Sequence, residues 1–409
     1  MRILYLVHDF FPHFHGGTER YVLNIARQMQ RMGHSVSVLT YGLKEPPESF
    51  TSLSEGVFVK AYSYEGIPVI CIRHQKMPEN IGLLIEDHEM EKAIEAIVRE
   101  KKFNIVHIAH PLRMGSCYKV AKKLGIPVVL TLTDFWLLCP WGRFYKPDYS
   151  LCNSPDDGKK CRRECGLGES ILNRYNEAKR LFETVDALIS PSRFLMEIFR
   201  ANGWKRQIYH VRHGVDYKYV ETYDRGKKHP GVVIFGYAGL VSRFKGVDLL
   251  VKSFSEVKSP HILLKLYGNL IEWEINFCSE LNLLLAKDER VRLMGKYSHE
   301  ELSSIMRDID ILVVPSTTLE SYGLVVVEAL AYNVPVIASD IVGSAYEFIQ
   351  HGKNGMIFSV QNPSELAEII RQIADNPSLV DTLRSNISHP PRLEEEAFMV
   401  EKIYKSVLH

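Results

Sequence analysis

Short β-type apolar runs alternate with helical stretches throughout the first half of the chain. The runs span residues 2–7, 36–40, 105–108, 127–132 and 187–190, and helical periodicity covers residues 19–32, 114–124 and 170–184. Helices between short buried strands are the connections that parallel strands need. The pattern therefore predicts the α/β class, with a parallel, doubly wound sheet.

A second alternation of strands and helices follows a break in the pattern. Residues 217–230 are polar, charged and end in a proline, which is typical of a linker. Further β-type runs follow at 232–237, 263–267, 291–294, 309–314, 335–338 and 355–358. The length of 409 residues is enough for two domains with cores of their own. We predict two Rossmann-like domains, 1–214 and 215–390, whose carboxyl edges face each other across a cleft. We also predict a C-terminal helix within 391–409 that packs back on the first domain.

The composition favours an ordinary globular enzyme. Hydrophobic residues make up 46% of the chain and charged residues 24%. The first apolar run ends at His8 and Asp9, which is too early for a signal peptide, and no window approaches 18 uncharged apolar residues. We therefore expect a cytoplasmic protein.

The charge is distributed unevenly along the chain. Residues 1–214 carry 30 basic and 23 acidic side chains, and residues 215–409 carry 20 and 26. The basic excess is too dilute for a nucleic-acid binder. It would suit peripheral contact of the first domain with an anionic inner membrane face, through a helix over 170–184 that carries Arg174, Lys179 and Arg180. A core-facing amphipathic helix with a solvated basic side is the alternative.

The segment 320–330 places two carboxylates eight positions apart after the apolar run 309–314. A helix that starts near Gly323 would point its free N–H groups and positive dipole end at the carboxyl edge of the sheet. Such a helix start binds anions and suits a diphosphate. Glu320 and Glu328 would hold hydroxyls on either side of the diphosphate. A surface helix with two solvated glutamates is the alternative.

A glycine-bounded basic turn, 239–246, follows the first strand of the second domain. Glycines at a strand end allow the backbone to approach a ligand, and Arg243 and Lys245 project beside them. Taken together with segment 320–330, the turn predicts a metal-free clamp for a diphosphate. By itself it would be an ordinary basic turn.

With these motifs the chain resembles the GT-B fold retaining glycosyltransferases of family 4, also called glycosyl transferases group 1. The resemblance covers nearly the whole chain and rests on motifs in the right order. They are Gly16-Gly17-Thr18-Glu19, Gly33-His34-Ser35-Val36, Val106 to Pro111, Gly125 to Thr131, Asp134 to Pro140, Ser190 to Phe194, Lys245-Gly246, Pro315-Ser316, Glu320 to Glu328, Pro335 to Ser339, Glu347 and Asn354-Gly355.

The resemblance implies roles for individual residues of the donor site. Lys245, joined by Arg243, would neutralise the donor diphosphate, and Glu320 would hold the transferred sugar. The backbone of Gly323, Leu324 and Val325 would bind the diphosphate, Glu328 would bind the ribose, and Gly295 and Lys296 would lie near the base. Gly16 and Gly17 would let the first domain's loop approach the donor.

The chain departs from the family pattern at three positions. Leu240 stands where arginine is frequent, so Arg243 would supply that charge from three residues later. Thr133 stands where histidine is frequent, and Ala109 stands where histidine or glutamine is common. His110 is therefore the best candidate of its loop for a catalytic residue on the acceptor side, next to Asp134, whereas His107 suits a buried, hydrogen-bonded position.

The implied reaction is metal-independent transfer of a hexose, with retention, from a nucleotide-diphosphate sugar to a hydroxyl. A UDP-sugar is favoured over GDP-mannose, and a saccharide or lipid-linked saccharide is the expected acceptor. No cofactor is expected for catalysis. The alternatives are a sugar-nucleotide-binding scaffold without turnover and a GT-B nucleotide-sugar epimerase. A dinucleotide dehydrogenase is disfavoured, because Gly-x-Gly-x-x-Gly follows neither first strand.

Four of the seven cysteines cluster in a charged, turn-rich stretch. Cys139, Cys152, Cys161 and Cys165 have the spacing C-x12-C-x8-C-x3-C. A cytoplasmic protein rarely keeps structural disulfides, and a zinc ion held by four thiolates would order a loop that lacks apolar residues. Reduced thiols and a redox or cluster role are the alternatives for the loop 139–165.

Overall fold

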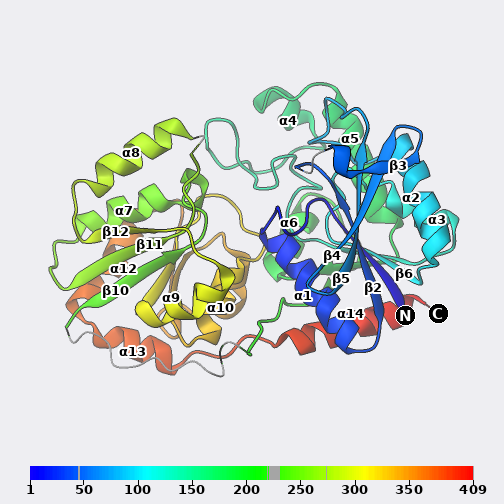
Figure 1. Ribbon diagram of the computed structural model, residues 1–409. Helices are drawn as coiled ribbons and strands as arrows, with labels where there is room; N and C mark the ends of the chain where they lie inside the picture. The colour runs from blue at the N-terminus through cyan, green and yellow to red at the C-terminus, as the bar shows by residue number, and fades with distance from the viewer. Residues whose placement is uncertain (45–46, 219, 221–230, 273, 409) are drawn as a thin grey trace. The chain divides into compact units, whose positions relative to one another are not determined.

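The computed structural model describes residues 1–44, 47–218, 220, 231–272 and 274–408. The chain divides into two compact units (Figure 1). Unit 1 comprises Met1–His213 and Leu393–His409, and unit 2 comprises Gly214–Arg392. In the described part of the chain, no helix combines the length and apolarity needed to cross a bilayer.

Unit 1 contains a nine-stranded sheet in the order β3-β4-β5-β2-β1-β6-β7-β8-β9. The central strands are rich in Val, Ile and Leu and almost wholly buried, as expected where helices cover both faces of a parallel sheet. The strands are β1 (Arg2–Val7), β2 (Ser35–Tyr41), β3 (Thr51–Ser54), β4 (Val57–Tyr64), β5 (Ile67–His74), β6 (Ile105–Ile108), β7 (Val128–Thr131), β8 (Ala187–Ser190) and β9 (Tyr209–His210).

The edge of this sheet corrects the prediction of a wholly parallel arrangement. β4 pairs antiparallel with both β3 and β5, and the β4–β5 ladder closes on the pair Tyr64–Ile67. The two residues of the turn, Glu65 and Gly66, both have positive φ (48° and 80°). That conformation matches the twist of a two-residue hairpin, so the chain reverses here without a crossover helix.

The helices of unit 1 are α1 (Gly17–Arg31), α2 (His88–Lys101), α3 (Cys117–Lys123), α4 (Lys159–Glu164), α5 (Ser170–Thr184), α6 (Arg193–Ala201) and α14 (Leu393–Val407), with a 3-10 turn at Pro47–Ser49. The last helix, α14, runs beside α1 (Figure 1). Tyr404 on α14 bonds the Tyr5 hydroxyl at 2.8 Å, and Glu401 pairs with His34 at 2.9 Å. The chain end therefore belongs to the core of unit 1.

The burial of α5 shows which side of this helix faces the core of unit 1. Ile171, Tyr175, Leu181 and Phe182 are buried, so its apolar side faces the core. Arg174, which was expected on a basic surface, is only 4% exposed. The prediction for Arg174 is wrong, because this residue lies on the buried side of the helix.

Unit 2 contains a six-stranded parallel sheet in the order β12-β11-β10-β13-β14-β15. The strands are β10 (Val233–Ala238), β11 (Ile262–Tyr267), β12 (Val291–Gly295), β13 (Ile311–Val314), β14 (Val336–Ser339) and β15 (Gly355–Phe358). The helices are α7 (Val247–Glu256), α8 (Ile275–Leu285), α9 (Leu302–Asp308), α10 (Leu324–Ala331), α11 (Gly343–Phe348), α12 (Ser364–Asp375) and α13 (Ser378–Ser385), with 3-10 turns at Arg243–Lys245 and His299–Glu301. Both units thus have the predicted doubly wound architecture.

Candidate active site

In unit 2 the strand order reverses between β10 and β13, and the predicted donor residues lie where these two neighbouring strands end. In open α/β sheets, ligands bind at such a switch point. Lys245 follows β10 and Glu320 follows β13, and the Lys245 Nζ lies 2.8 Å from the Glu320 Oε1. The Ser316 hydroxyl donates to the same carboxylate oxygen. The structure therefore brings a cation and a carboxylate together at this edge.

Glycine permits the close approach of the two loops. A Cβ on Gly246 would lie 1.9 Å from the carbonyl oxygen of Pro315, and Gly246 has φ of 70°. The backbone N–H of Thr317 donates to the Phe244 carbonyl at 3.1 Å across the same contact. Any side chain at position 246 would separate the Lys245 turn from the Glu320 loop.

Helix α10 begins beside the Lys245–Glu320 pair, at the predicted place. Its N-cap is Gly323, with φ of 90°, and Leu324 and Val325 form its first turn. The loop before it is fixed by two backbone bonds, from Glu320 N–H to the Ile341 carbonyl at 3.0 Å and from Gly343 N–H to the Glu320 carbonyl at 2.9 Å. The helix start is thus held rigidly next to Glu320.

Glu328, inside α10, faces the loop that follows β12. His299 Nδ1 lies 3.9 Å from the Glu328 Oε1. Burial, together with the Glu328 charge, raises the pKa of Tyr297 well above its ordinary value. Gly295 ends β12 with φ of 86°, and Lys296 beside it is exposed. The segment 295–299 and Glu328 therefore form one neighbourhood.

A buried tyrosine, Tyr237, adjoins the basic turn of this site. Its hydroxyl donates to the Leu240 carbonyl at 2.7 Å. Burial raises the pKa of Tyr237 well above its ordinary value, and the charges of Glu320 and Tyr297 act in the same direction. Sequence reasoning missed Tyr237, although it occupies β10 just before Gly239.

Arg243 is directed toward carboxylates of the neighbouring helices. Its Nη2 lies 2.6 Å from the Glu280 Oε2, and its Nη1 lies 3.3 Å from the Asp248 Oδ2. A phosphate at Arg243 would have to compete with both carboxylates. Of the two predicted cations, Lys245 is therefore the one that the structure joins to Glu320.

Unit 1 places His110 and Asp134 together at its own switch point, where β1 separates β2 from β6. His110 follows β6 and is 3% exposed, and its Nε2 lies 3.3 Å from the Asp134 Oδ2. Burial raises the pKa of Asp134, but the charge and hydrogen bond of His110 outweigh burial and hold the pKa below its ordinary value. The Asp134 side chain keeps 36% of its surface exposed, so this carboxylate is accessible.

A group of residues that sequence reasoning did not select surrounds His110. The rings of His8 and His110 lie 4.1 Å apart, and His8 Nε2 lies 3.6 Å from both Asp9 and Glu19. The Arg113 guanidinium contacts Asp9 at 2.8 Å and compensates its charge. The available signal was the polar pair His8-Asp9 directly after a buried first strand.

Burial governs the protonation of these side chains. It raises the pKa of Glu19 to about 7, and the nearby Asp9 charge acts in the same direction. It lowers the pKa of His8 well below the ordinary value, helped by His110 and Arg113. Gly16 caps α1, which begins at Gly17, and a Cβ on Gly16 would lie 2.4 Å from Glu19 Oε2. The absence of a side chain at Gly16 therefore leaves room for the Glu19 carboxylate.

The four clustered cysteines lie in one region of unit 1. All four are free thiols, and Cys139 and Cys161 are buried. Burial raises the pKa of Cys161 to about 12, and its three cysteine neighbours raise it further. Among the described residues, no three of these sulfurs lie within 4.8 Å of one another.

A buried arginine accompanies the thiols. Arg174 donates to the carbonyls of Trp136 and Leu137, its guanidinium lies 4.1 Å from the Trp136 ring centroid, and it interacts electrostatically with Cys139 and Cys161. Its Nε is buried and has no hydrogen-bond partner among the described residues. Thiolates are the ligands that zinc prefers, and a nearby cation would compensate their charge, so these side chains have the chemistry for zinc. The sulfurs would have to draw closer to meet one ion.

Comparison with known proteins gives the class of protein. The family model "Glycosyltransferase Family 4" matches residues 15–219, and "Glycosyl transferases group 1" matches residues 221–389. An uncharacterized glycosyltransferase of Methanocaldococcus jannaschii is 25% identical over 97% of this chain and 96% of its own. D-inositol 3-phosphate glycosyltransferase 1 of Catenulispora acidiphila is 25% identical over 90% of this chain and 85% of its own.

Solved structures agree on the fold. Anabaena HepE in complex with UDP and glucose superposes with a TM-score of 0.70 at 19% identity, covering 99% of this chain and 100% of that one. Sucrose-phosphate synthase of Thermosynechococcus elongatus gives a TM-score of 0.69 at 19% identity, covering 99% and 98%. The protein is a glycosyltransferase with the GT-B fold. It belongs to glycosyltransferase family 4.

Proposed function

We propose that this enzyme transfers a hexose from a UDP-sugar to a hydroxyl of a saccharide or lipid-linked saccharide, with retention of anomeric configuration and without a catalytic metal. The observation that carries the proposal is the Lys245–Glu320 pair at the switch point of unit 2, beside the start of α10. A cation and a helix N-terminus suit the leaving diphosphate, and a carboxylate suits the sugar hydroxyls.

The chemistry follows from where charge develops. The bond between the anomeric carbon and the phosphate oxygen breaks, and the acceptor oxygen forms the new bond on the same face. The acceptor proton passes to the leaving phosphate. Lys245 and the N–H groups of α10 would stabilise the negative charge on that phosphate, and Glu320 would hold the sugar. Glu320 is already bonded by Lys245 and Ser316, which favours a holding role over nucleophilic attack.

The choice of UDP is supported by similar proteins. Anabaena HepE has been crystallised with UDP, with UDP-glucose, and with UDP and glucose. The base would lie along segment 295–299, with the ribose at Glu328. GDP-mannose remains the second candidate donor.

A donor screen followed by a transfer assay tests the proposal. Thermal shift with UDP-, GDP- and ADP-sugars should select a UDP-hexose, and EDTA should leave transfer unchanged as long as bound zinc is retained. NMR of the product should show the donor's anomeric configuration. UDP-sugar binding without UDP release in any acceptor mixture would favour a scaffold. Formation of a sugar that is inverted at one carbon relative to the donor sugar would favour an epimerase.

We also propose that Cys139, Cys152, Cys161 and Cys165 hold one structural zinc ion in unit 1. Two observations support this. Three of the thiols have pKa values raised by burial and by the other cysteines, so a metal that binds thiolates would relieve a shared electrostatic penalty. The buried Arg174 guanidinium, with its unbonded Nε, would compensate the net charge of a four-thiolate site.

Elemental analysis tests the zinc proposal without any activity assay. Protein purified without added metal should contain about one zinc per chain, and Cys161→Ser should lose it, whereas the control Cys278→Ser in unit 2 should keep it. Four thiols that alkylate rapidly in the native, zinc-free protein would overturn the proposal in favour of reduced cysteines.

A further inference from the structure

A row of aromatic side chains projects from the cysteine segment of unit 1. Trp141 is 45% exposed and Tyr149 is 48% exposed, with the half-buried Tyr145 between them. The ring centroids of Trp141 and Tyr145 lie 6.4 Å apart, and those of Tyr145 and Tyr149 lie 6.2 Å apart. Large exposed aromatics that are grouped rather than scattered mark an interaction surface.

The row is rigidly built. Lys146 N–H donates to the Ser150 carbonyl at 2.9 Å, Tyr149 N–H donates to the Lys146 carbonyl at 2.9 Å, and Asp148 accepts from Ser150. These bonds close a tight turn that holds the Tyr145 and Tyr149 rings nearly parallel, at 9°. Rings held in advance lose little conformational entropy when a ligand binds.

The row adjoins the accessible carboxylate of the candidate acceptor site. A Cβ built on Gly142 would lie 3.5 Å from the Asp134 Oδ2, so the backbone next to Trp141 passes close to this carboxylate. Asp134 in turn contacts His110. The segment that carries the aromatic row therefore begins beside the candidate acceptor site.

We propose that the row Trp141–Tyr145–Tyr149 binds the sugar rings of a saccharide acceptor, so that the hydroxyl to be glycosylated reaches Asp134 and His110. This inference rests on the proposed transferase function and adds the acceptor subsite to it. The C–H face of a pyranose carries partial positive charge and packs on the negative face of an aromatic ring. Tyrosine hydroxyls and the nearby Asp148 and Lys146 supply hydrogen-bonding groups for the rim of each sugar.

The charge between the two tyrosines favours a saccharide over a membrane surface as the occupant. Lys146 is paired with Glu164 at 3.3 Å, and Asp148 lies in the turn itself, so the basic charge between Tyr145 and Tyr149 is balanced. Binding to anionic lipid would need a basic excess around the aromatics. Aromatic rings with mixed polar neighbours instead match the alternating apolar and hydroxyl faces of a glycan.

A glycan array of short linear oligosaccharides, probed with the full chain in the presence of UDP, tests this directly. We expect retention of at least one hexose or N-acetylhexosamine oligomer, weakened about tenfold by Tyr149→Ala or Trp141→Ala and restored by Tyr149→Phe. Tyr209→Ala, which removes another exposed aromatic of unit 1, is the matched control and should retain the glycan fully.

Two results would overturn the acceptor subsite. One is that no oligosaccharide on the array is retained by the native chain. The other is that the retained glycan binds the Trp141→Ala and Tyr149→Ala proteins as well as it binds the native one. UDP affinity, measured on the same proteins by calorimetry, keeps the two proposals apart. Loss of the subsite leaves UDP binding intact, whereas failure of the proposed function shows as no UDP binding in the native chain.

Discussion

At the switch point of unit 2, one lysine faces one glutamate beside a helix N-terminus. At the switch point of unit 1, His8 lies against the His110 ring and beside the buried carboxylates of Asp9 and Glu19, and Arg113 pairs with Asp9. The first arrangement presents positive potential and fixed N–H donors, which suit an anion. The second keeps the Asp134 carboxylate accessible beside His110, which suits hydroxyl groups. The same sheet topology therefore carries opposite electrostatics in the two units.

The largest expected effect comes from removing the cation of unit 2. Lys245→Ala should weaken UDP and UDP-sugar binding by about 2–4 kcal/mol, because a charge-assisted contact to the diphosphate is lost. Glu328→Ala should weaken donor binding in the same direction. Isothermal titration calorimetry measures both. Unchanged donor affinity in both variants would mean that unit 2 does not use this site.

The matched control for Lys245 is Lys252→Ala, which removes a lysine that pairs with Glu280 at 2.6 Å in the same unit. It should leave donor affinity unchanged. Glu320→Gln sharpens the comparison, because it removes the carboxylate that pairs with Lys245 and so frees the lysine for the diphosphate. We expect UDP binding to be retained or tighter in this variant, while turnover falls.

The start of α10 and the place of Glu320 before it were predictable from local sequence, whereas Lys245 lies far from Glu320 in the chain and only the fold brings the two together. Strand β13, the loop with Glu320 and the start of α10 at Leu324 form one continuous segment, and the helix start follows from Gly323. Periodicity also predicted the bounds of α5 and α14. In these segments the local sequence pattern and the tertiary structure agree, so the pattern alone was enough to predict the structure.

The unit 1 cluster could not be read in the same way. Asp9 and Arg113 are 104 residues apart, and only the pairing of β1 with β6 brings them together. Arg174 is a different case, since its burial had a signal. It stands three residues after Ile171 and four before Ala178, on the apolar stripe of α5. We assigned Arg174 to the surface because of its charge, although its spacing places it on the buried side of the helix.

The second prediction tests the acceptor side. His110→Ala should lower the transfer rate about 100-fold, as expected when a side chain that contacts the reacting groups is lost. Donor affinity should not change, because the side chains that we assign to the diphosphate, the sugar and the ribose lie in unit 2. Steady-state kinetics at saturating donor measure the first quantity and calorimetry the second. His34→Ala, which removes a histidine paired with Glu401, is the control. Full activity of His110→Ala would move the acceptor site elsewhere.

The third prediction concerns stability. Burial raises the pKa of Glu19 to about 7, so the folded protein keeps a proton there that the unfolded chain has already released. The free energy of unfolding should therefore fall as pH rises from about 4.5 to about 7, by about 3 kcal/mol. Glu19→Gln should remove this slope and stabilise the protein above pH 7.

Urea unfolding of unit 1 at several pH values checks the Glu19 prediction. Glu183→Gln, at an exposed position on α5, is the control and should keep the native pH dependence. The same slope in Glu19→Gln and in the native protein would assign the pH dependence to another group, with Asp9 the next candidate because burial also raises its pKa.

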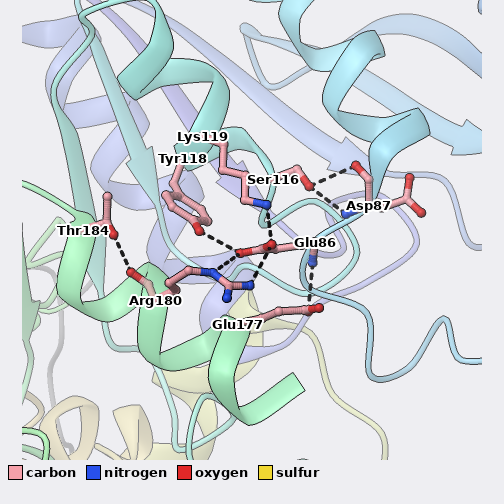
Figure 2. Close-up of polar contacts among 8 residues, drawn as sticks. All are labelled: Glu86, Asp87, Ser116, Tyr118, Lys119, Glu177, Arg180 and Thr184. Atoms are coloured by element: carbon pink, nitrogen blue, oxygen red, sulfur yellow. Dashed lines mark hydrogen bonds and ion pairs between the residues drawn. The ribbon is translucent and has the colours of Figure 1, made fainter. Parts of the chain in front are cut away.

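The smallest expected effect concerns the membrane. The apolar residues of α5 lie in the core, and Arg174 is buried. Figure 2 shows that Arg180 and Lys119 both reach the Glu86 carboxylate, so two of the basic side chains near this helix are already paired. Burial raises the pKa of Glu86, but these cations together with Tyr118 outweigh burial and hold the pKa below its ordinary value, so Glu86 stays charged at neutral pH.

Lys179 by itself would contribute only about 1 kcal/mol to the free energy of binding at an anionic surface. We therefore expect no salt-sensitive co-sedimentation with phosphatidylserine vesicles, and no change on Lys179→Ala. Binding at low salt that Lys179→Ala and Arg180→Ala abolish would show instead that α5 contacts anionic lipid, and that unit 1 reaches its acceptor at a membrane.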